Sequence, residues 1–290
     1  MKILITGCNG QVGISLVNKL TGVVEFLAVD RESLDITDEQ AVTRLVAEYN
    51  PDIIINAAAY TAVDRAESES ELAFSVNRDG PKYLAKAAQK TGAVLLHIST
   101  DYVFSGGKAG EYSETDKTAP QSVYGRSKLE GESAVIGNCD RHIILRTAWV
   151  FSEYGNNFVK TMLRLGQDRE ALSIVGDQYG GPTYAGDIAE ALIHISNVIH
   201  TKQEVNWGIY NFSGSPHVSW YDFAAEVFKK AAEHKVINRV PTLSNIPTSD
   251  YPTPASRPAN SKLNCSKISR EFNIVPSDWQ QALNQIQDYK

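Results

Sequence analysis

Tyr124 and Lys128 are the residues of this chain whose types and spacing best suit proton transfer. Residues four apart lie on one face of a helix, about one turn from each other. A lysine ammonium in that position favours the ionised phenol and lowers a tyrosine pKa that is otherwise about 10. The adjacent hydroxyl residues Ser99 and Thr100 lie upstream. We therefore interpret Tyr124 as a candidate acid or base that works with Lys128 and Thr100.

A glycine-rich segment near the N-terminus has the spacing of a dinucleotide-binding loop. Gly7, Gly10 and Gly13 form the pattern G-x-x-G-x-x-G between an expected strand and an expected helix. Glycines allow the backbone to approach a pyrophosphate closely, and the helix N-terminus supplies N–H donors. An ordinary glycine turn is the alternative, but this context favours a nucleotide. We expect the cofactor to be bound here by Gly7, Asn9, Gly10, Gln11, Val12 and Gly13.

Two charged residues and a run of small ones extend this expected site. Asp30 ends the second expected strand, near the distance of roughly 20 residues at which an acid binds the ribose 2′-hydroxyl. Arg31 follows and suits a 2′-phosphate, so NADH and NADPH both remain open. The small residues of segment 56–60 would let the chain pass close to a flat ligand, although tight helix–strand packing explains them equally well. Beyond the glycine loop, we assign to the cofactor site Asp30, Arg31, Asp35, Ile36, Ala58, Ala59, Tyr60, Tyr124 and Lys128.

The elements that must position these residues alternate in the first half of the chain, as in a doubly wound parallel sheet. In such a sheet, ligands bind beyond the carboxyl ends of the strands, so Thr100 and Tyr124 would converge beside a nicotinamide. The expected strands are 3–6, 25–29, 52–56, 94–98 and 142–146. The expected helices are 11–20, 39–49, 71–91 with a possible kink at Gly80-Pro81, and 124–135.

The pattern becomes less regular after Trp149. We expect helices over 157–165 and 221–234, and strands over 172–175 and 208–212. The proline-rich stretch 241–262 predicts an ordered surface loop, and a loop this long is often functional. We predict an α/β fold with two parts: a Rossmann-type domain over 1–150 plus about 184–213, and a smaller, irregular α/β substrate domain over about 151–183 and 214–290.

Composition excludes several classes of protein. The formal charge is −6 over 290 residues and no basic cluster stands out, so nucleic acid is not an expected partner. No apolar run approaches the roughly 20 residues that span a bilayer. The apolar stretch at the N-terminus is too short for a signal peptide. Cys8, Cys139 and Cys265 are odd in number and far apart, which indicates a reducing cytoplasm. The histidines form no H-E-x-x-H pair, so we expect no histidine-built metal site.

These residues together resemble the extended short-chain dehydrogenase/reductase family, and the resemblance runs nearly end to end. The glycine loop and the Tyr-x-x-x-Lys motif carry the general likeness. More specific segments are similar to the members that reduce dTDP-linked keto-deoxysugars. Those segments are 56–64, Ser99-Thr-Asp-Tyr-Val-Phe104, 146–151, 155–162 and Arg257-Pro258.

The resemblance implies reduction of the C4 ketone of dTDP-4-dehydro-β-L-rhamnose to dTDP-β-L-rhamnose by NADPH or NADH. That is the last step of a nucleotide-sugar pathway that feeds bacterial surface polysaccharides. It makes Tyr124 the proton donor, Lys128 its partner and Thr100 the hydroxyl that tunes its pKa. It implies that Arg257 pairs with the pyrophosphate, which suits a bidentate guanidinium. The sugar nucleotide would be bound by Thr100, Asp101, Tyr102, Trp149, Asn157 and Arg257.

Some members of that family form a dimer through a magnesium ion held by glutamates, one of them on the first helix. Ser15 occupies the matching position here and has no carboxylate. Bound Mg²⁺ is therefore doubtful, and we expect a monomer or a weak homodimer.

Three alternatives remain open. The chain could reduce another nucleotide-linked keto-sugar. It could be an epimerase or dehydratase that retains its cofactor through a cycle. It could also be a non-catalytic regulatory subunit on the same fold, although the intact Tyr124, Lys128 and Thr100 argue against that.

Overall fold

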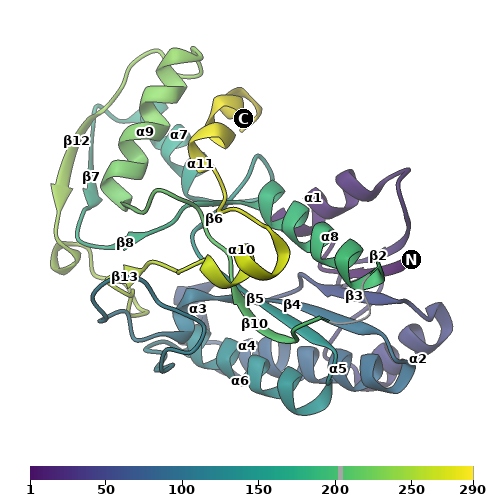
Figure 1. Cartoon of the computed structure of the whole chain (residues 1–290). Coiled ribbons are helices and arrows are strands. Elements are labelled where there is room, and N and C mark those ends of the chain that lie inside the picture. Colours follow the sequence, from purple (N-terminus) through teal and green to yellow (C-terminus); the bar gives the residue numbers. More distant parts are fainter. Residues whose placement is uncertain (202–204, 290) are drawn as a thin grey trace.

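A six-stranded parallel sheet forms the centre of the computed structural model, which describes residues 1–201 and 205–289 (Figure 1). Its central strands are buried along almost their whole length, because Ile, Leu and Val occupy both faces. From edge to edge the strands are β2 (Glu25–Val29), β1 (Lys2–Thr6), β3 (Ile53–Asn56), β4 (Val94–Thr100), β5 (His142–Thr147) and β10 (Gly208–Asn211).

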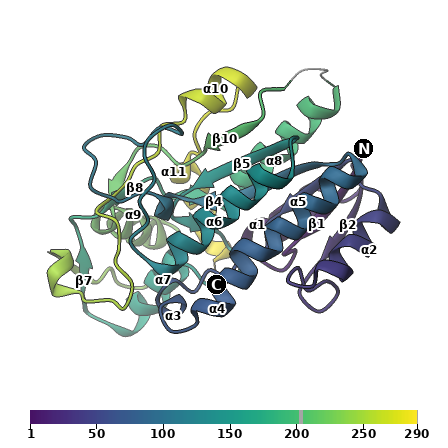
Figure 2. The same cartoon turned by 90° about the horizontal axis from the view of Figure 1, so that it is seen from below.

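Helices cover both faces of this sheet. One layer contains α1 (Gln11–Leu20), α8 (Ala185–Thr201) and α10 (Ser266–Phe272). The other contains α2 (Glu39–Tyr49), α5 (Gly80–Thr91) and α6 (Val123–Asn138), and Figure 2 shows α5 and α6 side by side across the sheet. The strand order reverses between β1 and β3, and ligands bind at such a switch point. The predicted doubly wound parallel fold is confirmed.

The helical stretch predicted over 71–91 is divided in the structure. It consists of α4 (Ser70–Phe74), a π-helical turn (Ser75–Asp79) and α5, so the irregularity lies one turn before Gly80-Pro81. Pro81 has no N–H to donate to the preceding turn, and widening that turn accommodates the loss. The π-helical turn also directs Asn77 toward its neighbours: the Asn77 side chain bonds the backbone of Tyr60 and the hydroxyl of Ser127.

A second hydrophobic core lies beyond the sheet, around Phe151, Phe223, Phe228 and Trp279. It is built largely from the second half of the chain, as expected for a separate substrate domain. The boundaries of that domain, about 151–183 and 214–290, remain a proposal. Its helices are α7 (Phe158–Asp168), α9 (Trp220–Glu233) and α11 (Trp279–Ala282). The remaining elements are α3 (Val63–Ala66), β6 (Val150–Phe151), β7 (Ala171–Val175), β8 (Tyr179–Gly180), β9 (Thr183–Tyr184), β11 (Val218–Ser219), β12 (Thr242–Ile246) and β13 (Asn260–Ser261).

The second half contains several elements that the sequence did not predict, among them α10, α11 and the short strands β6, β8, β9 and β11. Helix α8 was not predicted, because its residues are apolar on most sides and give no clear helical stripe; it is buried against α1 and the sheet. The stretch 241–262 is not all loop. It contains β12, which pairs in parallel with β7, and β13, and Pro241 and Pro247 flank β12 rather than interrupt it. Among the described residues, no helix is long and apolar enough to span a membrane.

Candidate active site

The glycine loop after β1 is packed so closely that side chains are excluded from it. A Cβ on Gly7, whose φ is +71°, would lie 2.6 Å from the Ala58 backbone. A Cβ on Gly13 would lie 2.1 Å from the Gly7 carbonyl oxygen. Helix α1 begins at Gln11 with no side-chain cap and no acidic residue in its first turn, so its first N–H groups are left for an anion. The loop therefore fits the pyrophosphate of a dinucleotide.

Gly13→Ala is expected to weaken cofactor binding roughly tenfold or more, because overpacking costs about 1–3 kcal/mol and here moves the loop backbone. Gly137→Ala is the matched control. It makes the same change in a helix, at a position with nothing within 4 Å of the added Cβ. Titration of cofactor fluorescence measures both dissociation constants. Equal constants for the two variants would show that the close packing at Gly13 does not shape the site.

A cavity of about 450 Å³ lies beside the glycine loop. Apolar side chains that the sequence did not single out, Leu34, Leu72 and Val76, form part of its lining and suit a flat purine ring. Most of the predicted cofactor residues meet here. Those lining the cavity are Gly7, Gly10, Asp30, Arg31, Asp35, Ile36, Ala58, Ala59 and Tyr60.

The two charged residues after β2 are held differently. The Asp30 carboxylate accepts hydrogen bonds from the Ser33 hydroxyl (2.7 Å), the Ser33 N–H (2.9 Å) and the Asn9 amide (2.9 Å), which together lower its pKa. Asp30 is therefore ionised and fixed as an acceptor. Arg31 is exposed and makes no hydrogen bond or ion pair with the described residues. Its guanidinium can therefore turn toward a phosphate.

The predicted cofactor residues that do not line the cavity are Asn9, Gln11, Val12, Gly13, Tyr124 and Lys128. Val12 packs in the core beneath the sheet. The Gln11 amide oxygen accepts from the Ser152 hydroxyl (3.0 Å) and from the Asn157 amide (3.0 Å). Asn157 also caps α7 by accepting from the Lys160 N–H (3.1 Å). The Asn157 side chain thus joins the glycine loop to the second core, and its polar atoms are engaged within the protein rather than presented to a substrate.

Helix α6 brings the phenol to the end of β4. Ser122 caps the helix by accepting from the Gly125 N–H (3.1 Å), and a Cβ on Gly125 would lie 2.3 Å from the Tyr102 carbonyl oxygen. This close approach places the Tyr124 ring edge-on to the Tyr102 ring, with centroids 5.4 Å apart. One turn later, Lys128 is buried and its Nζ donates to the Ile98 carbonyl (2.7 Å).

The electrostatics of this helix differ from the sequence expectation. Burial raises the pKa of Tyr124 well above its ordinary value, the Asp101 and Tyr102 side chains raise it further, and a hydrogen bond from Thr100 lowers it. The net direction of the shift is therefore upward, because burial outweighs the interactions that lower the Tyr124 pKa. Burial lowers the pKa of Lys128 to about 8, although the Glu132 carboxylate acts in the opposite direction and raises it. At neutral pH the phenol is protonated and most of the lysine is charged.

The hydroxyl pair at the end of β4 separates, because successive strand residues face opposite sides. The Ser99 hydroxyl donates to Glu132 Oε1 (2.6 Å), away from the phenol. The Thr100 hydroxyl donates to Asp101 Oδ1 (3.1 Å) and accepts from the Tyr102 N–H (3.2 Å). Thr100 is therefore the member of the pair that reaches the reaction site.

Asp101 is a buried carboxyl beside Thr100. The Ser261 hydroxyl donates to its Oδ2, a contact across 160 residues that the sequence did not predict. No cation pairs with Asp101 in the described part of the chain, and burial raises its pKa to about 6. Asp101 is thus a desolvated carboxyl at the end of β4, held by the Thr100 and Ser261 hydroxyls.

Arg257 and Trp149 flank the site from the second half of the chain. Arg257 donates from NH2 to Asp64 Oδ2 (2.6 Å) and from NH1 to the Tyr102 hydroxyl (3.2 Å). Trp149 has a φ of +50°, an uncommon conformation for a bulky residue, and it stacks on Trp220 with ring centroids 3.5 Å apart. The guanidinium and the indole are thus fixed before any ligand binds.

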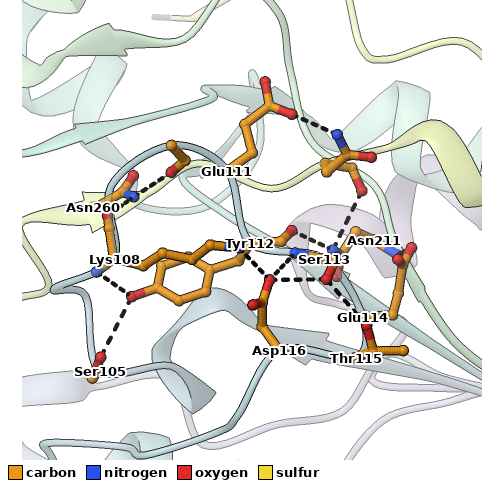
Figure 3. Close-up of polar contacts among 12 residues, drawn as sticks. Ser105, Lys108, Glu111, Tyr112, Ser113, Glu114, Thr115, Asp116, Asn211 and Asn260 are labelled. Atoms are coloured by element: carbon orange, nitrogen blue, oxygen red, sulfur yellow. Dashed lines mark hydrogen bonds and ion pairs between the residues drawn. The ribbon is translucent and has the colours of Figure 1, made fainter.

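The segment that carries Arg257 is braced by the loop over residues 105–116 (Figure 3). The Asn260 amide donates to the Lys108 carbonyl (2.7 Å), and the Lys108 N–H donates to the Tyr112 hydroxyl (3.0 Å). A Cβ on Gly106 would lie 2.5 Å from Pro258, so this loop packs tightly against the residue after Arg257. These contacts fix the position of Arg257 and of Ser261.

The structure gives no carboxylate cluster for a metal at the start of α1. Ser15 is buried, and its hydroxyl donates to the Gln11 carbonyl (2.9 Å). Within residues 1–201 and 205–289, no group of three or more His, Cys, Asp or Glu side chains is placed to hold a metal ion. The described cysteines are free thiols.

Fold and site together define an extended short-chain dehydrogenase/reductase. A glycine loop lies at the switch point of a doubly wound sheet, and a Tyr-x-x-x-Lys helix lies beside a strand-end threonine. A family model described as RmlD substrate binding domain matches residues 1–289. The chain therefore belongs to the RmlD substrate binding domain family.

Similar proteins extend over the whole chain. A protein of Aggregatibacter actinomycetemcomitans named dTDP-4-dehydrorhamnose reductase is 52% identical over 290 residues, covering 99% of both chains. The crystal structure of a dTDP-4-dehydrorhamnose reductase from Clostridium acetobutylicum has a TM-score of 0.91 at 40% identity, covering 99% of both chains. The structure of that name from Bacillus anthracis, in complex with NADP, has a TM-score of 0.90 at 37% identity and covers 100% of this chain and 99% of that chain.

Proposed function

We propose that this protein reduces the C4 ketone of dTDP-4-dehydro-β-L-rhamnose to give dTDP-β-L-rhamnose, with NADPH or NADH. The observation that carries the proposal is the placement of a protonated Tyr124 beside Thr100 and Asp101, with Arg257 fixed next to it. A proton donor for a ketone and a cation for a diphosphate thus lie in one site. The full-length relatives named dTDP-4-dehydrorhamnose reductase support the choice of sugar nucleotide.

The proton chemistry rests on Tyr124. A bound nicotinamide supplies the hydride that converts the carbonyl carbon to an alcohol carbon. The oxygen of that group takes its proton from the Tyr124 hydroxyl, because a developing alkoxide is a stronger base than a phenolate. The high pKa of Tyr124 keeps the donor loaded at neutral pH. The Thr100 hydroxyl accepts from the Tyr102 N–H and turns its one proton from Asp101 to the same oxygen, which it orients.

Substrate recognition rests on residues from both halves of the chain. Arg257 releases Asp64 and pairs with the diphosphate, since a guanidinium fork bonds two oxygens at once. Trp149 offers a half-buried ring face, and Asp101 offers a desolvated carboxyl for a sugar hydroxyl. Lys128, whose Nζ donates to the Ile98 carbonyl in the structure, would hold the nicotinamide ribose. We also propose a cytoplasmic enzyme, a monomer or weak homodimer, in keeping with its three free thiols.

Cofactor choice depends on the two residues after β2. Arg31→Gln is expected to raise the KM for NADPH about tenfold, the size of a charge-assisted hydrogen bond, and to leave the KM for NADH nearly unchanged. Asp30 remains available for a ribose hydroxyl in that variant. Initial rates with each cofactor at saturating keto-sugar measure the effect. An equal rise for both cofactors would mean that Arg31 does not contact a 2′-phosphate.

The direct test follows NADPH and NADH oxidation with dTDP-4-dehydro-β-L-rhamnose. Stoichiometric oxidation supports the reductase and excludes an epimerase or dehydratase, which returns its cofactor unchanged. Turnover only with a GDP- or UDP-linked keto-sugar would overturn the substrate and keep the reaction type. Cofactor binding without turnover of any keto-sugar would favour a regulatory subunit.

A further inference from the structure

A buried ion pair that the mechanism above does not use lies on the catalytic helix. Glu132 of α6 accepts from Arg146 of β5 through two bonds, to Oε1 from Nε (2.9 Å) and to Oε2 from NH2 (2.6 Å). Each side chain is only 2% exposed. Removing such charges from water costs several kcal/mol per ion, so a buried pair is weak evidence for stability alone. Its place in the fold points to another role.

The Glu132 carboxylate connects three elements at the reaction site. It lies one helical turn after Lys128 and two turns after Tyr124, on the same face of α6. The Ser99 hydroxyl donates to it (2.6 Å), and Ser99 is opposite Arg146 in the β4–β5 register. One carboxylate thus ties α6 to the end of β4 that carries the reactive threonine, and to the neighbouring strand.

Several elements packed against α6 carry charged residues, but Glu132 is the charged group that shifts the pKa of Lys128. Its carboxylate is the group that raises the Lys128 pKa against burial. His97 is buried in β4 and remains neutral, because burial and the Lys128 charge both lower its pKa. The titratable and charged groups on the elements packed against this part of α6 include His97, Asp101, Tyr102, Arg146, Arg78 and Asp79, and those on α6 itself include Tyr124, Glu130 and Glu132.

We propose that Glu132, Arg146 and Ser99 form a positioning unit for the reaction, an inference that rests on the proposed function. The unit anchors the face of α6 that carries Tyr124 to the strand end that carries Thr100. It also keeps a carboxylate one turn from the Lys128 ammonium, so that this lysine stays cationic at working pH. The bidentate guanidinium fixes the carboxylate in place.

The test is the pH dependence of kcat/KM, which reports groups of the free enzyme. In the wild type, we expect activity to fall as pH rises through about 8, where Lys128 loses its proton. Glu132→Gln removes the carboxylate and leaves the Arg146 cation, which disfavours charged Lys128. The alkaline limb of its pH profile, where activity falls with rising pH, is expected to move to lower pH by about one unit or more. That is within the range of pKa shifts that nearby charges produce. Activity recovers toward the wild-type value on the acid side.

Arg146→Gln gives the opposite shift. It leaves the carboxylate with Lys128 as its remaining cation, so the limb moves to higher pH. Glu132→Gln/Arg146→Gln removes both charges and returns the limb toward the wild-type position. Ser99→Ala and Arg146→Lys alter the packing of the unit as the charge variants do, but they keep both charges. The alkaline limbs of their pH profiles are therefore expected to stay in place. Circular dichroism and melting curves establish which variants fold. If Glu132→Gln does not fold, comparing the alkaline limb of Arg146→Lys with that of Arg146→Gln tests the same charge effect.

The outcomes separate the two proposals. Absence of wild-type turnover overturns the proposed function and this inference with it. An active wild type whose charge variants lose kcat/KM equally at every pH, with the limb unmoved, overturns the positioning unit and leaves the function standing. Shifts of opposite sign for Glu132→Gln and Arg146→Gln support it, since a purely structural role gives no such pair.

Discussion

Tyr124→Phe is expected to lower kcat by about 10²- to 10⁴-fold, the usual contribution of a positioned general acid. The change removes one oxygen and keeps the ring that packs edge-on against Tyr102. Burial keeps the Tyr124 phenol protonated at neutral pH, and a hydrogen bond links it to the Thr100 side chain. Cofactor affinity is expected to change little. Steady-state rates at saturating substrate measure kcat, and cofactor fluorescence measures binding.

Tyr289→Phe is the matched control for this variant. The Tyr289 ring is buried in the second core, and its hydroxyl has no hydrogen-bond partner among the described residues. The same atom is therefore removed from a buried tyrosine that lies in no candidate site, and kcat is expected to stay near the wild-type value. A Tyr124→Phe enzyme that is as active as Tyr289→Phe would mean that another acid protonates the oxygen.

Arg257→Ala is expected to lower kcat/KM by about 10- to 100-fold, mainly through KM, because hydrogen bonds to a charged group contribute about 1.5–3 kcal/mol. The guanidinium is positioned by Asp64 and Tyr102 before substrate arrives. The protein as a whole is acidic, so a dianionic diphosphate depends on this local cation. Steady-state kinetics over a range of dTDP-sugar concentrations separate KM from kcat.

Two comparisons test whether the loss in Arg257→Ala comes from the contact with the diphosphate. Arg239→Ala removes an exposed arginine that pairs with Glu170 outside the site, and its kinetics are expected to match the wild type. Competition by dTDP is expected to weaken strongly in Arg257→Ala, and competition by thymidine is not, because thymidine lacks the diphosphate. Equal weakening for both inhibitors would show that Arg257 acts on the shape of the site rather than on the diphosphate.

Local patterns predicted most of the first half of the fold. The spacing of Gly7, Gly10 and Gly13 indicated a tight loop, and the structure shows why Gly13 tolerates no Cβ. Helix α8 was missed because a helix buried on most sides gives no amphipathic stripe. Strand β12 was missed because it is short, largely exposed and paired with a distant segment, so it carries no alternating pattern.

The site shows a sharper limit. Tyr124, Lys128 and Thr100 could be selected from spacing, but the direction of the Tyr124 pKa shift could not, because it is set by burial. Contacts between distant residues were also invisible. Ser261 reaches Asp101 across 160 residues, and Arg257 reaches Asp64 across 193. Nothing in the local sequence around either residue records such a partner.

The central claim is that hydride is delivered to C4 of the sugar nucleotide and that Tyr124 protonates the oxygen there. The most direct measurement uses NADPH deuterated at both positions of the nicotinamide C4, with dTDP-4-dehydro-β-L-rhamnose, and NMR of the purified product. We predict deuterium at C4 of a rhamno-configured sugar, with the deuterated cofactor consumed in proportion to product. Product without deuterium at C4, cofactor that is not consumed, or a sugar with the opposite C4 configuration would contradict it.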